Sequence, residues 1–158
     1  MSADTTLSRE FTITRILSAP PETVFAYWTE PDQMTWWGPD GTTTPRDTIS
    51  VDLRSGGFWR LTMVDDRTGE RYPTEGIFTD VEPPNLLRFS WGDQGHRPED
   101  APLVTVRFEP YPDGRTELIF TLEMGDNLPE EKVRELLSIG IKPGWTQTID
   151  RLRALLQV

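Results

Sequence analysis

The sequence lacks cysteine, and histidine occurs once, at His96, in a chain of 158 residues. The absence of cysteine excludes disulfide bonds, iron–sulfur clusters, thiolate zinc sites and a cysteine nucleophile, and it fits a reducing compartment. One histidine cannot supply the several His or Cys ligands on which a zinc site normally draws. We therefore expect neither a metal site nor a cofactor.

Long hydrophobic runs are also missing. No apolar stretch approaches the roughly 20 residues that a membrane-spanning helix needs. Residues 1–8 are polar, and they have no apolar centre of the kind that a secretory signal peptide carries. We expect a cytoplasmic protein that does not bind membranes.

Positive charge is scarce, since 16 Lys and Arg residues stand against 26 Asp and Glu residues, which gives a net charge of −10. The acidic residues are spread along the chain rather than gathered in a tail. A charge of this sign repels nucleic-acid phosphates and anionic lipid surfaces. We therefore expect no nucleic acid and no membrane as a partner.

The N-terminal part of the chain predicts one strand followed by two short helices. Residues 9–17 alternate loosely between apolar and polar side chains, as a strand does. Pro20–Pro21 ends this strand and suits the first turn of a helix. Asp32 can cap a second short helix, which Gly38–Pro39 ends.

The middle of the chain, from about Thr42 to Met124, changes to a period of two, with Gly- and Pro-containing turns between the apolar runs. Such runs predict an antiparallel meander, to which residues 9–17 add a seventh strand. Apolar and polar side chains alternate, so we expect one face of the sheet to be buried. The six predicted strands of this part are Thr48–Arg54, Phe58–Val64, Thr74–Val81, Leu86–Trp91, Leu103–Pro110 and Thr116–Met124.

The C-terminal residues return to helix. Gly140 and Pro143 interrupt a helical segment that starts near Pro129, and a final helix is predicted from about Gly144. Its apolar side chains recur at helical spacing, so we expect the helix to lay this stripe on the apolar face of the sheet. The stripe consists of Trp145, Ile149, Leu152 and Leu156.

Short motifs follow one another along almost the whole chain: Arg15–Pro20, Trp36–Pro39, Gly56–Trp59, Gly76–Pro84, Leu87–Trp91 and Gly144–Trp145. Together they resemble homologues of the activator of the heat-shock-protein-90 ATPase, in the START-like (SRPBCC) superfamily. The resemblance implies an α+β helix-grip fold like that of the birch pollen allergen. In it a seven-stranded curved antiparallel sheet surrounds a long C-terminal helix, and two short helices follow the first strand. It also implies a single domain over residues 1–158, with a core at about 9–156, and an apolar cavity between sheet and helix.

Aromatic residues make up 10% of the chain, and they can fill a core or form the apolar wall of a small-molecule pocket. Trp36 and Trp37 are adjacent, so on a helical turn they point about 100° apart and one of them can line the mouth of a cavity. We expect Trp145 to pack near Phe120 or Trp91 and to form one end of the cavity. The predicted ligand-binding residues are Trp36, Trp59, Met63, Phe89, Trp91, Phe120, Trp145 and Ile149.

The sequence contains no motif for a catalytic nucleophile or triad. His96 falls in Gly92–Pro102, which we expect to be a solvated surface loop. These features favour a binding module for a small hydrophobic or aromatic molecule over an enzyme. One alternative is a polyketide cyclase- or hydrolase-like enzyme, for which only Arg15 and Tyr27 are candidate groups.

Another alternative, implied by the resemblance, is a co-factor of the heat-shock-protein-90 ATPase. The eukaryotic activators resemble this chain in their C-terminal domain and carry a separate chaperone-binding domain before it. Only about eight residues precede the first predicted strand here, so we expect ligand binding rather than chaperone activation. No feature of the sequence predicts an oligomeric state.

Overall fold

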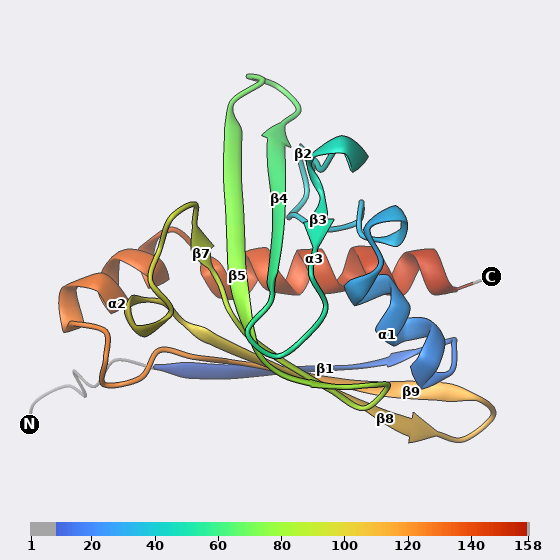
Figure 1. Cartoon of the computed structure of the whole chain (residues 1–158). Helices are drawn as coiled ribbons and strands as arrows, with labels where there is room; N and C mark the ends of the chain where they lie inside the picture. The colour runs from blue at the N-terminus through green and yellow to red at the C-terminus, as the bar shows by residue number, and fades with distance from the viewer. Residues whose placement is uncertain (1–8, 158) are drawn as a thin grey trace, which may run out of the picture.

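The computed structural model describes residues 9–157, so the prediction that Met1–Ser8 is not a signal peptide lies outside the described residues. Helices, 3-10 turns (η) and strands alternate in an α+β arrangement (Figure 1). In chain order they are β1 (Glu10–Leu17), α1 (Pro21–Thr29), η1 (Pro31–Gln33), β2 (Thr42–Thr43), η2 (Arg46–Thr48), β3 (Ser50–Val51), β4 (Phe58–Asp65), β5 (Arg71–Glu82), β6 (Leu86–Ser90), β7 (Gly92–Asp93), η3 (Pro98–Asp100), β8 (Leu103–Tyr111), β9 (Arg115–Glu123), α2 (Glu130–Ser138) and α3 (Ile141–Leu156).

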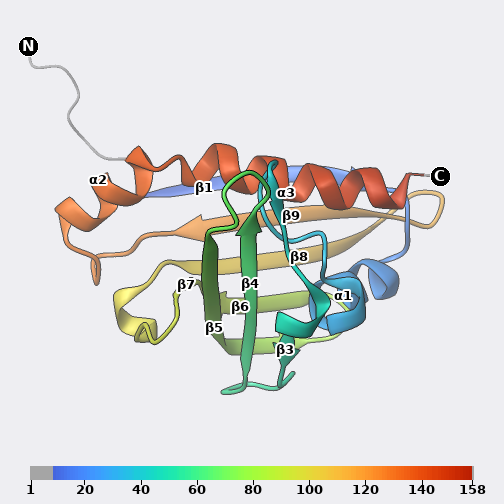
Figure 2. The same cartoon turned by 90° about the horizontal axis from the view of Figure 1, so that it is seen from above.

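The strands form one nine-stranded antiparallel sheet with the order β1-β9-β8-β6-β5-β4-β2, while β3 pairs with β4 and β7 with β5. Strands β4 and β5 stand steeply to β1, β8 and β9, so the sheet curves around α3 (Figure 1). Seen from above, α1 covers the sheet near the C-terminal end of α3, and α2 lies at the other end (Figure 2). The helix-grip fold predicted from the sequence is therefore confirmed.

The strand count is higher than the predicted seven, because the short strands β2 and β7 add to the sheet. Thr42–Thr43 pairs with the end of β4, and Gly92–Asp93 pairs with β5. Each covers two residues, which is too short for a periodic pattern in the sequence. The predicted strand Thr48–Arg54 is also shorter than expected, since only Ser50–Val51 pairs with β4.

The second short helix predicted after Asp32 is wrong. Only the 3-10 turn Pro31–Gln33 forms, and the chain passes through Trp36 and Trp37 without helix. The Trp36 indole donates a hydrogen bond to the Tyr27 carbonyl oxygen at 2.9 Å, and the Trp37 carbonyl oxygen accepts one from the Thr44 hydroxyl at 2.6 Å. These tertiary contacts outweigh a helix this short, which has little stability of its own.

Helix α3 lays its apolar stripe on the sheet, as predicted, and Trp145, Ile149, Leu152 and Leu156 are all buried. It begins at Ile141, three residues before the predicted start at Gly144. Pro143 therefore falls in the first turn, where a missing N–H costs no helical hydrogen bond. None of the helices among residues 9–157 is both long enough and apolar enough to cross a membrane.

Gly76 on β5 brings one side chain unusually close to the backbone. A Cβ atom at this position would collide with the Ser90 carbonyl oxygen and with the indole of Trp59, its partner residue on β4. Glycine in a strand interior marks such a close approach. The Trp59 indole consequently lies close to the β5 backbone, and its ring contacts that of Trp37 at 4.8 Å between ring centres.

Candidate ligand-binding site

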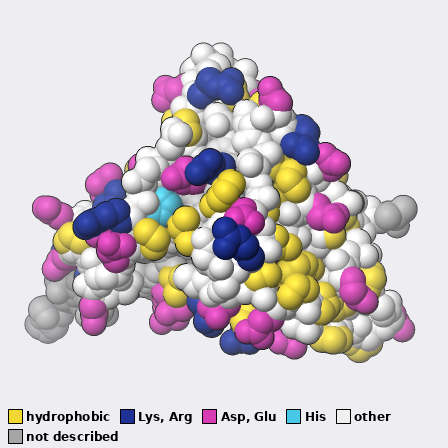
Figure 3. Space-filling view, viewed as in Figure 1, with side chains coloured by type: hydrophobic (Ala, Val, Ile, Leu, Met, Phe, Trp, Pro, Cys, Tyr) yellow, Lys and Arg dark blue, Asp and Glu magenta, His cyan; other side chains and the backbone are white. Residues whose placement is uncertain are grey.

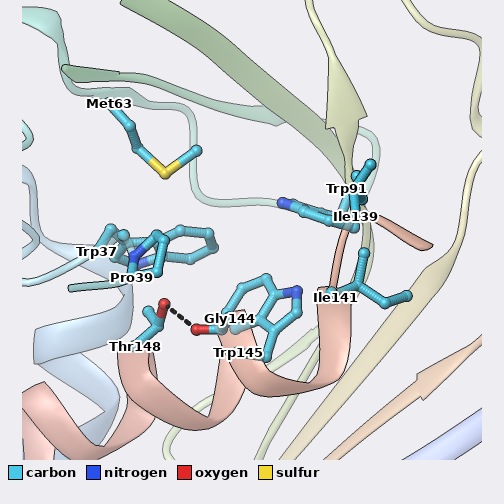
Figure 4. Close-up of a pocket in the computed structure, with 11 residues that line it drawn as sticks. Trp37, Pro39, Met63, Trp91, Ile139, Ile141, Gly144, Trp145 and Thr148 are labelled. Carbon is cyan, nitrogen blue, oxygen red and sulfur yellow. Dashed lines mark hydrogen bonds between the residues drawn. The ribbon is translucent and has the colours of Figure 1, made fainter. Parts of the chain in front are cut away.

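A pocket opens between the sheet and the first turns of α3, and we call it the inner pocket (Figure 4). Its volume is about 180 Å³, and its wall is almost entirely apolar. It is lined by Trp37, Gly38, Pro39, Met63, Trp91, Ile139, Gly140, Ile141, Gly144, Trp145 and Thr148.

The junction of α2 and α3 shapes one side of the inner pocket. Gly140 has a φ of 80°, in the left-handed region that favours glycine, and this residue reverses the chain between the two helices. Ile139 and Ile141 flank it, and Ile139 is 69% exposed at the mouth of the pocket. The next turns of α3 present Gly144 and Thr148, which share a helix face. The Thr148 hydroxyl donates to the Gly144 carbonyl oxygen at 2.8 Å (Figure 4).

The opposite wall is a loop that α3 holds in place. Arg151 donates from Nη1 to the carbonyl oxygens of Gly38 and Pro39, at 2.8 and 3.1 Å, and from Nη2 to that of Thr42 at 3.1 Å. The charged guanidinium makes these hydrogen bonds stronger than neutral ones. Arg151 therefore holds the loop that carries Gly38 and Pro39 in place, although Arg151 itself does not line the inner pocket. The sequence does not indicate this role, because the acceptors of Arg151 are backbone atoms more than 100 residues away in the chain.

Trp145 forms the floor of the inner pocket. Its ring centre lies 4.6 Å from that of Phe120, 5.1 Å from that of Trp37 and 5.6 Å from that of Trp91. The predicted packing of Trp145 near Phe120 or Trp91 is thus confirmed. The side chain is only 4% exposed, although one side of it borders the pocket.

A second pocket, which we call the outer pocket, adjoins the inner one and shares Met63, Trp91 and Ile139 with it. Its volume is about 280 Å³, and its wall is more polar. Hydrophobic side chains and the histidine meet in this part of the surface (Figure 3). The titratable residues around it are Tyr72, Asp93, His96, Asp100, Lys132 and Glu135.

His96 is half-buried and hydrogen-bonded, so the prediction of a solvated loop residue is wrong. Its Nδ1 lies 2.9 Å from the Asp93 carbonyl oxygen, which can only accept, so Nδ1 donates. The other ring nitrogen, Nε2, hydrogen-bonds the Ser90 hydroxyl at 3.1 Å. The ring fits here because Gly92 has no side chain: a Cβ atom there would lie 3.1 Å from the imidazole. The Ser90 hydroxyl also accepts a hydrogen bond from the Ile77 N–H on β5. Ser90 therefore links the loop that carries His96 to β5.

Tyr72 contributes a neutral phenol to the outer pocket. The pKa of its hydroxyl is raised because it hydrogen-bonds the Glu70 carboxylate, and burial and the nearby negative charges act in the same direction. Among residues 9–157 no three His, Asp or Glu side chains lie close enough together to hold a metal ion.

The residues predicted to bind a ligand divide into two groups. Met63, Trp91 and Trp145 line the inner pocket. The others lie in the core behind it and do not reach the wall: Trp36, Trp59, Phe89, Phe120 and Ile149. Of the adjacent tryptophans, Trp37 reaches the pocket, because Trp36 turns under α1 toward Tyr27. A ligand-binding role for any of them stays a prediction.

The two residues considered for catalysis lie elsewhere. Arg15 pairs with Asp150 at 2.7 Å between β1 and α3, with both side chains partly exposed. Tyr27 packs against the core, and neither residue lines the inner or the outer pocket.

Comparison with solved structures finds the same fold in several bacterial proteins and in a eukaryotic one. The solution structure of a protein from Arthrobacter aurescens has a TM-score of 0.79 at 23% identity, over 98% of this chain and 92% of that one. The AHSA1 protein from Silicibacter pomeroyi has a TM-score of 0.72 at 30% identity, over 93% and 96%. An HSP90 activator from Plasmodium falciparum has a TM-score of 0.61 at 24% identity, over 92% and 96%.

Comparison of the sequence with curated proteins finds no match. The model of one protein family, described as Activator of Hsp90 ATPase homolog 1-like protein, matches residues 18–157. Because this match spans most of the chain, and the Silicibacter AHSA1 protein is 30% identical over nearly all of it, the chain belongs to the Activator of Hsp90 ATPase homolog 1-like family.

Proposed function

We propose that the protein binds a small hydrophobic or aromatic molecule in the inner pocket. The observation that carries this proposal is the wall of three tryptophans, Met63 and Ile141 around about 180 Å³ of space. An apolar cavity of about 150 Å³ is large enough to hold a benzene ring. The inner pocket therefore suits one ring with a short substituent, and the outer pocket leaves room for a more polar extension.

Ile139 and Met63 are suited to control entry. Both border the two pockets, and Ile139 is exposed at the junction of α2 and α3. Unbranched methionine adapts its shape to irregular apolar surfaces. A ring that passes between these side chains comes to lie against Trp145, where its burial removes apolar surface from water and supplies the binding free energy.

Gly144 allows a test that does not depend on damaging the core. A Cβ atom added there meets nothing within 4 Å beyond its chain neighbours and the backbone of its own helix, and Gly144 lines the inner pocket. Gly144→Leu should therefore fill the pocket while the helix stays intact. The matched control is Ala154→Leu, which adds the same side chain at an exposed position of the same helix.

The experiment measures the melting temperature and tryptophan fluorescence during titration with acetophenone, a one-ring probe. Binding to the folded state should raise the melting temperature of the wild type and of Ala154→Leu by mass action, and Gly144→Leu should show no shift. Equal shifts in all three proteins would place the probe outside the inner pocket. No shift in any of them, with this probe or its hydrocarbon analogue, would refute the proposal.

Stimulation of a chaperone ATPase is the second candidate function, and the description of the matching family favours it. The test is the ATPase rate of purified Hsp90 with increasing amounts of this protein. A rate increase that saturates would support chaperone activation, whereas an unchanged rate at saturating protein would eliminate it. Gly144→Leu separates the two functions, because filling the pocket should leave an ATPase effect unchanged.

A further inference from the structure

The methionines of the described chain differ in how accessible their sulfur atoms are. Met34 and Met124 lie in the core and are 0% exposed. Met63 on β4 is half-buried and lines both the inner and the outer pocket. Figure 4 shows its sulfur-bearing end directed into the inner pocket, toward Trp37. Among residues 9–157, Met63 is therefore the methionine whose thioether a small molecule in the pockets can reach.

The backbone of the neighbouring loop keeps this sulfur at the pocket wall. A Cβ atom on Gly38 would lie 3.3 Å from the Met63 sulfur, so the thioether packs directly against this glycine. Arg151 holds the carbonyl oxygen of the same glycine at 2.8 Å. Gly38 has a φ of 112°, a backbone conformation that favours glycine. The sulfur therefore has a defined place at the boundary of the two pockets.

A thioether in such a position can react with peroxides. A sulfur lone pair attacks one oxygen of hydrogen peroxide, the O–O bond breaks and an S–O bond forms. The hydroxide that leaves takes the proton from the new S–OH group and becomes water. The sulfur is oxidised by two electrons, and the peroxide is reduced by two. The product, methionine sulfoxide, is polar, and methionine sulfoxide reductases return it to the thioether.

Oxidation of Met63 would change the character of the wall that a ligand meets. The wall of the inner pocket is almost entirely apolar, and no described residue that lines it has a charged side chain. A sulfoxide oxygen that points into this space binds water, which an apolar ring can displace only at a cost. A sulfoxide that turns toward the more polar outer pocket carries the side chain away from the ring. Either position removes an apolar contact from the ligand.

We infer that Met63 is a site of reversible oxidation by peroxides, and that its sulfoxide form releases the ligand of the inner pocket. The first half of this inference depends only on the accessibility of the sulfur. The second half rests on the proposed function, because it needs a ligand in the inner pocket. The protein then binds its ligand in the reduced state and releases it after oxidation, while the fold stays the same.

Peptide mapping by mass spectrometry tests the first half. The folded protein is treated with hydrogen peroxide for increasing times, and each methionine is followed on its own tryptic peptide. Met63 should be oxidised at least about tenfold faster than Met34 and Met124, because a fully buried sulfur reacts only when the fold opens. In denaturant the three rates should become equal. Equal rates in the folded protein would overturn the inference.

Titration with acetophenone tests the second half. The oxidised protein should bind this probe about tenfold more weakly than the reduced protein. Its melting temperature without the probe should change little, because Met63 is only half-buried. Treatment with methionine sulfoxide reductases should restore the affinity.

Two variants assign the effect to the Met63 sulfur. Met63→Leu keeps an apolar side chain of similar volume, so it should bind acetophenone like the wild type and keep its affinity after peroxide treatment. Met63→Gln carries a polar end on an unbranched chain, so it should bind as weakly as the oxidised wild type without any peroxide. Both variants should unfold at nearly the wild-type melting temperature.

The remaining outcomes separate the inference from the proposed function. If the oxidised wild type binds acetophenone as tightly as the reduced protein, or if peroxide weakens binding to Met63→Leu as well, the inference is overturned and the proposed function stands. If the reduced wild type binds neither acetophenone nor its hydrocarbon analogue, the proposed function fails, and the second half of the inference fails with it.

Discussion

Two ends of the same aromatic core differ in how completely they are filled. Under α1 lies a packed region, made of Trp28 and its neighbours Phe25, Trp36 and Phe108, whose ring centres come within 4.9 Å at Trp28–Trp36 and 5.3 Å at Phe25–Phe108. At the other end, beside the α2–α3 junction, Trp145 contacts Trp37 and Trp91 at similar distances of 5.1 and 5.6 Å between ring centres, but these three rings line the inner pocket. Aromatic content alone does not separate the two.

The difference comes from what covers each end. Helix α1 supplies Val24, Phe25 and Trp28 to close the packed region, and all three are buried. The α2–α3 junction instead presents glycines at Gly140 and Gly144, which leave side-chain space unfilled. A pocket in this fold is therefore made by small residues on the covering helix as much as by large ones on the sheet.

Trp28→Ala is the largest expected effect. Trp28 is 2% exposed and meets Trp36, Trp37, Phe108 and Phe120, so its removal should lower the free energy of unfolding by about 3–5 kcal/mol. Chemical denaturation measures the loss. The control is Leu155→Ala on the exposed side of α3, which should stay within about 0.5 kcal/mol of wild type. A small loss at Trp28 would mean that the packed region is loosely filled too.

Trp145→Ala should cost less, about 2–3 kcal/mol, because one side of the ring already faces open space and fewer contacts are lost. Denaturation in the same buffer gives the value, and titration with acetophenone should show weakened binding. If Trp145→Ala is as costly as Trp28→Ala, the inner pocket is closed in solution and the contrast between the two ends disappears.

Gly144→Ala is expected to stabilise the protein by about 0.5–1 kcal/mol, because glycine in a helix interior costs that much relative to alanine. The new methyl group meets nothing within 4 Å beyond its chain neighbours and the backbone of its own helix, and Gly144 lines the inner pocket. Gly140→Ala is the matched control, since its φ of 80° should make the same change destabilising by about 1–2 kcal/mol. A loss of stability at Gly144 would show that this space is already filled.

The smallest expected effect concerns the pH dependence of stability, and it arises in a turn outside both ends of the aromatic core. Asp65 occupies the turn between β4 and β5, where its carboxylate accepts from the N–H groups of Thr68 and Arg67, and these bonds lower its pKa below 3.8. A carboxyl group with a lowered folded-state pKa stabilises the protein above pH 3.8, its unfolded value, and loses this contribution as pH falls through the folded value.

Asp65→Asn should therefore remove part of the acid dependence of stability below pH 3.8. Denaturation curves at several acidic pH values measure this, with Asp66→Asn as the control in the same turn. The tryptophan fluorescence of both ends should be the same in the two variants at neutral pH. An unchanged acid dependence would mean that the turn hydrogen bonds do not hold the carboxylate in solution.

Several predictions from the sequence are confirmed because they depend on local periodicity. The stripe from Trp145 to Leu156 repeats at helical spacing, and an amphipathic helix of this length must bury that face. The alternation in Val104–Phe108 and Leu118–Leu122 likewise predicts which side of β8 and β9 is buried.

The division of the tryptophans could not be predicted in the same way. Trp36 and Trp37 are residues of the same type and adjacent in the sequence. The helical turn expected for them does not form. Which ring turns under α1 and which reaches the inner pocket is decided by the bond to Tyr27 and by the position of α3. The role of Arg151 and the burial of His96 could not be predicted for a related reason. The acceptors of Arg151 are backbone carbonyl oxygens, and His96 packs where Gly92 has no side chain, and neither arrangement leaves a sequence motif.

The order of strands and helices and an aromatic apolar interior could therefore be predicted from periodic patterns and turn residues, because these act over short distances, and the family resemblance added the helix-grip arrangement. Where that interior is filled and where it stays open depends on the tertiary structure. That outcome depends on how much volume the covering elements bring to each end, and Trp28 on α1 brings a large side chain where Gly144 on α3 brings none. Close packing depends on the shapes of the two surfaces that face each other. The order of residues along the chain does not show which surfaces will face each other.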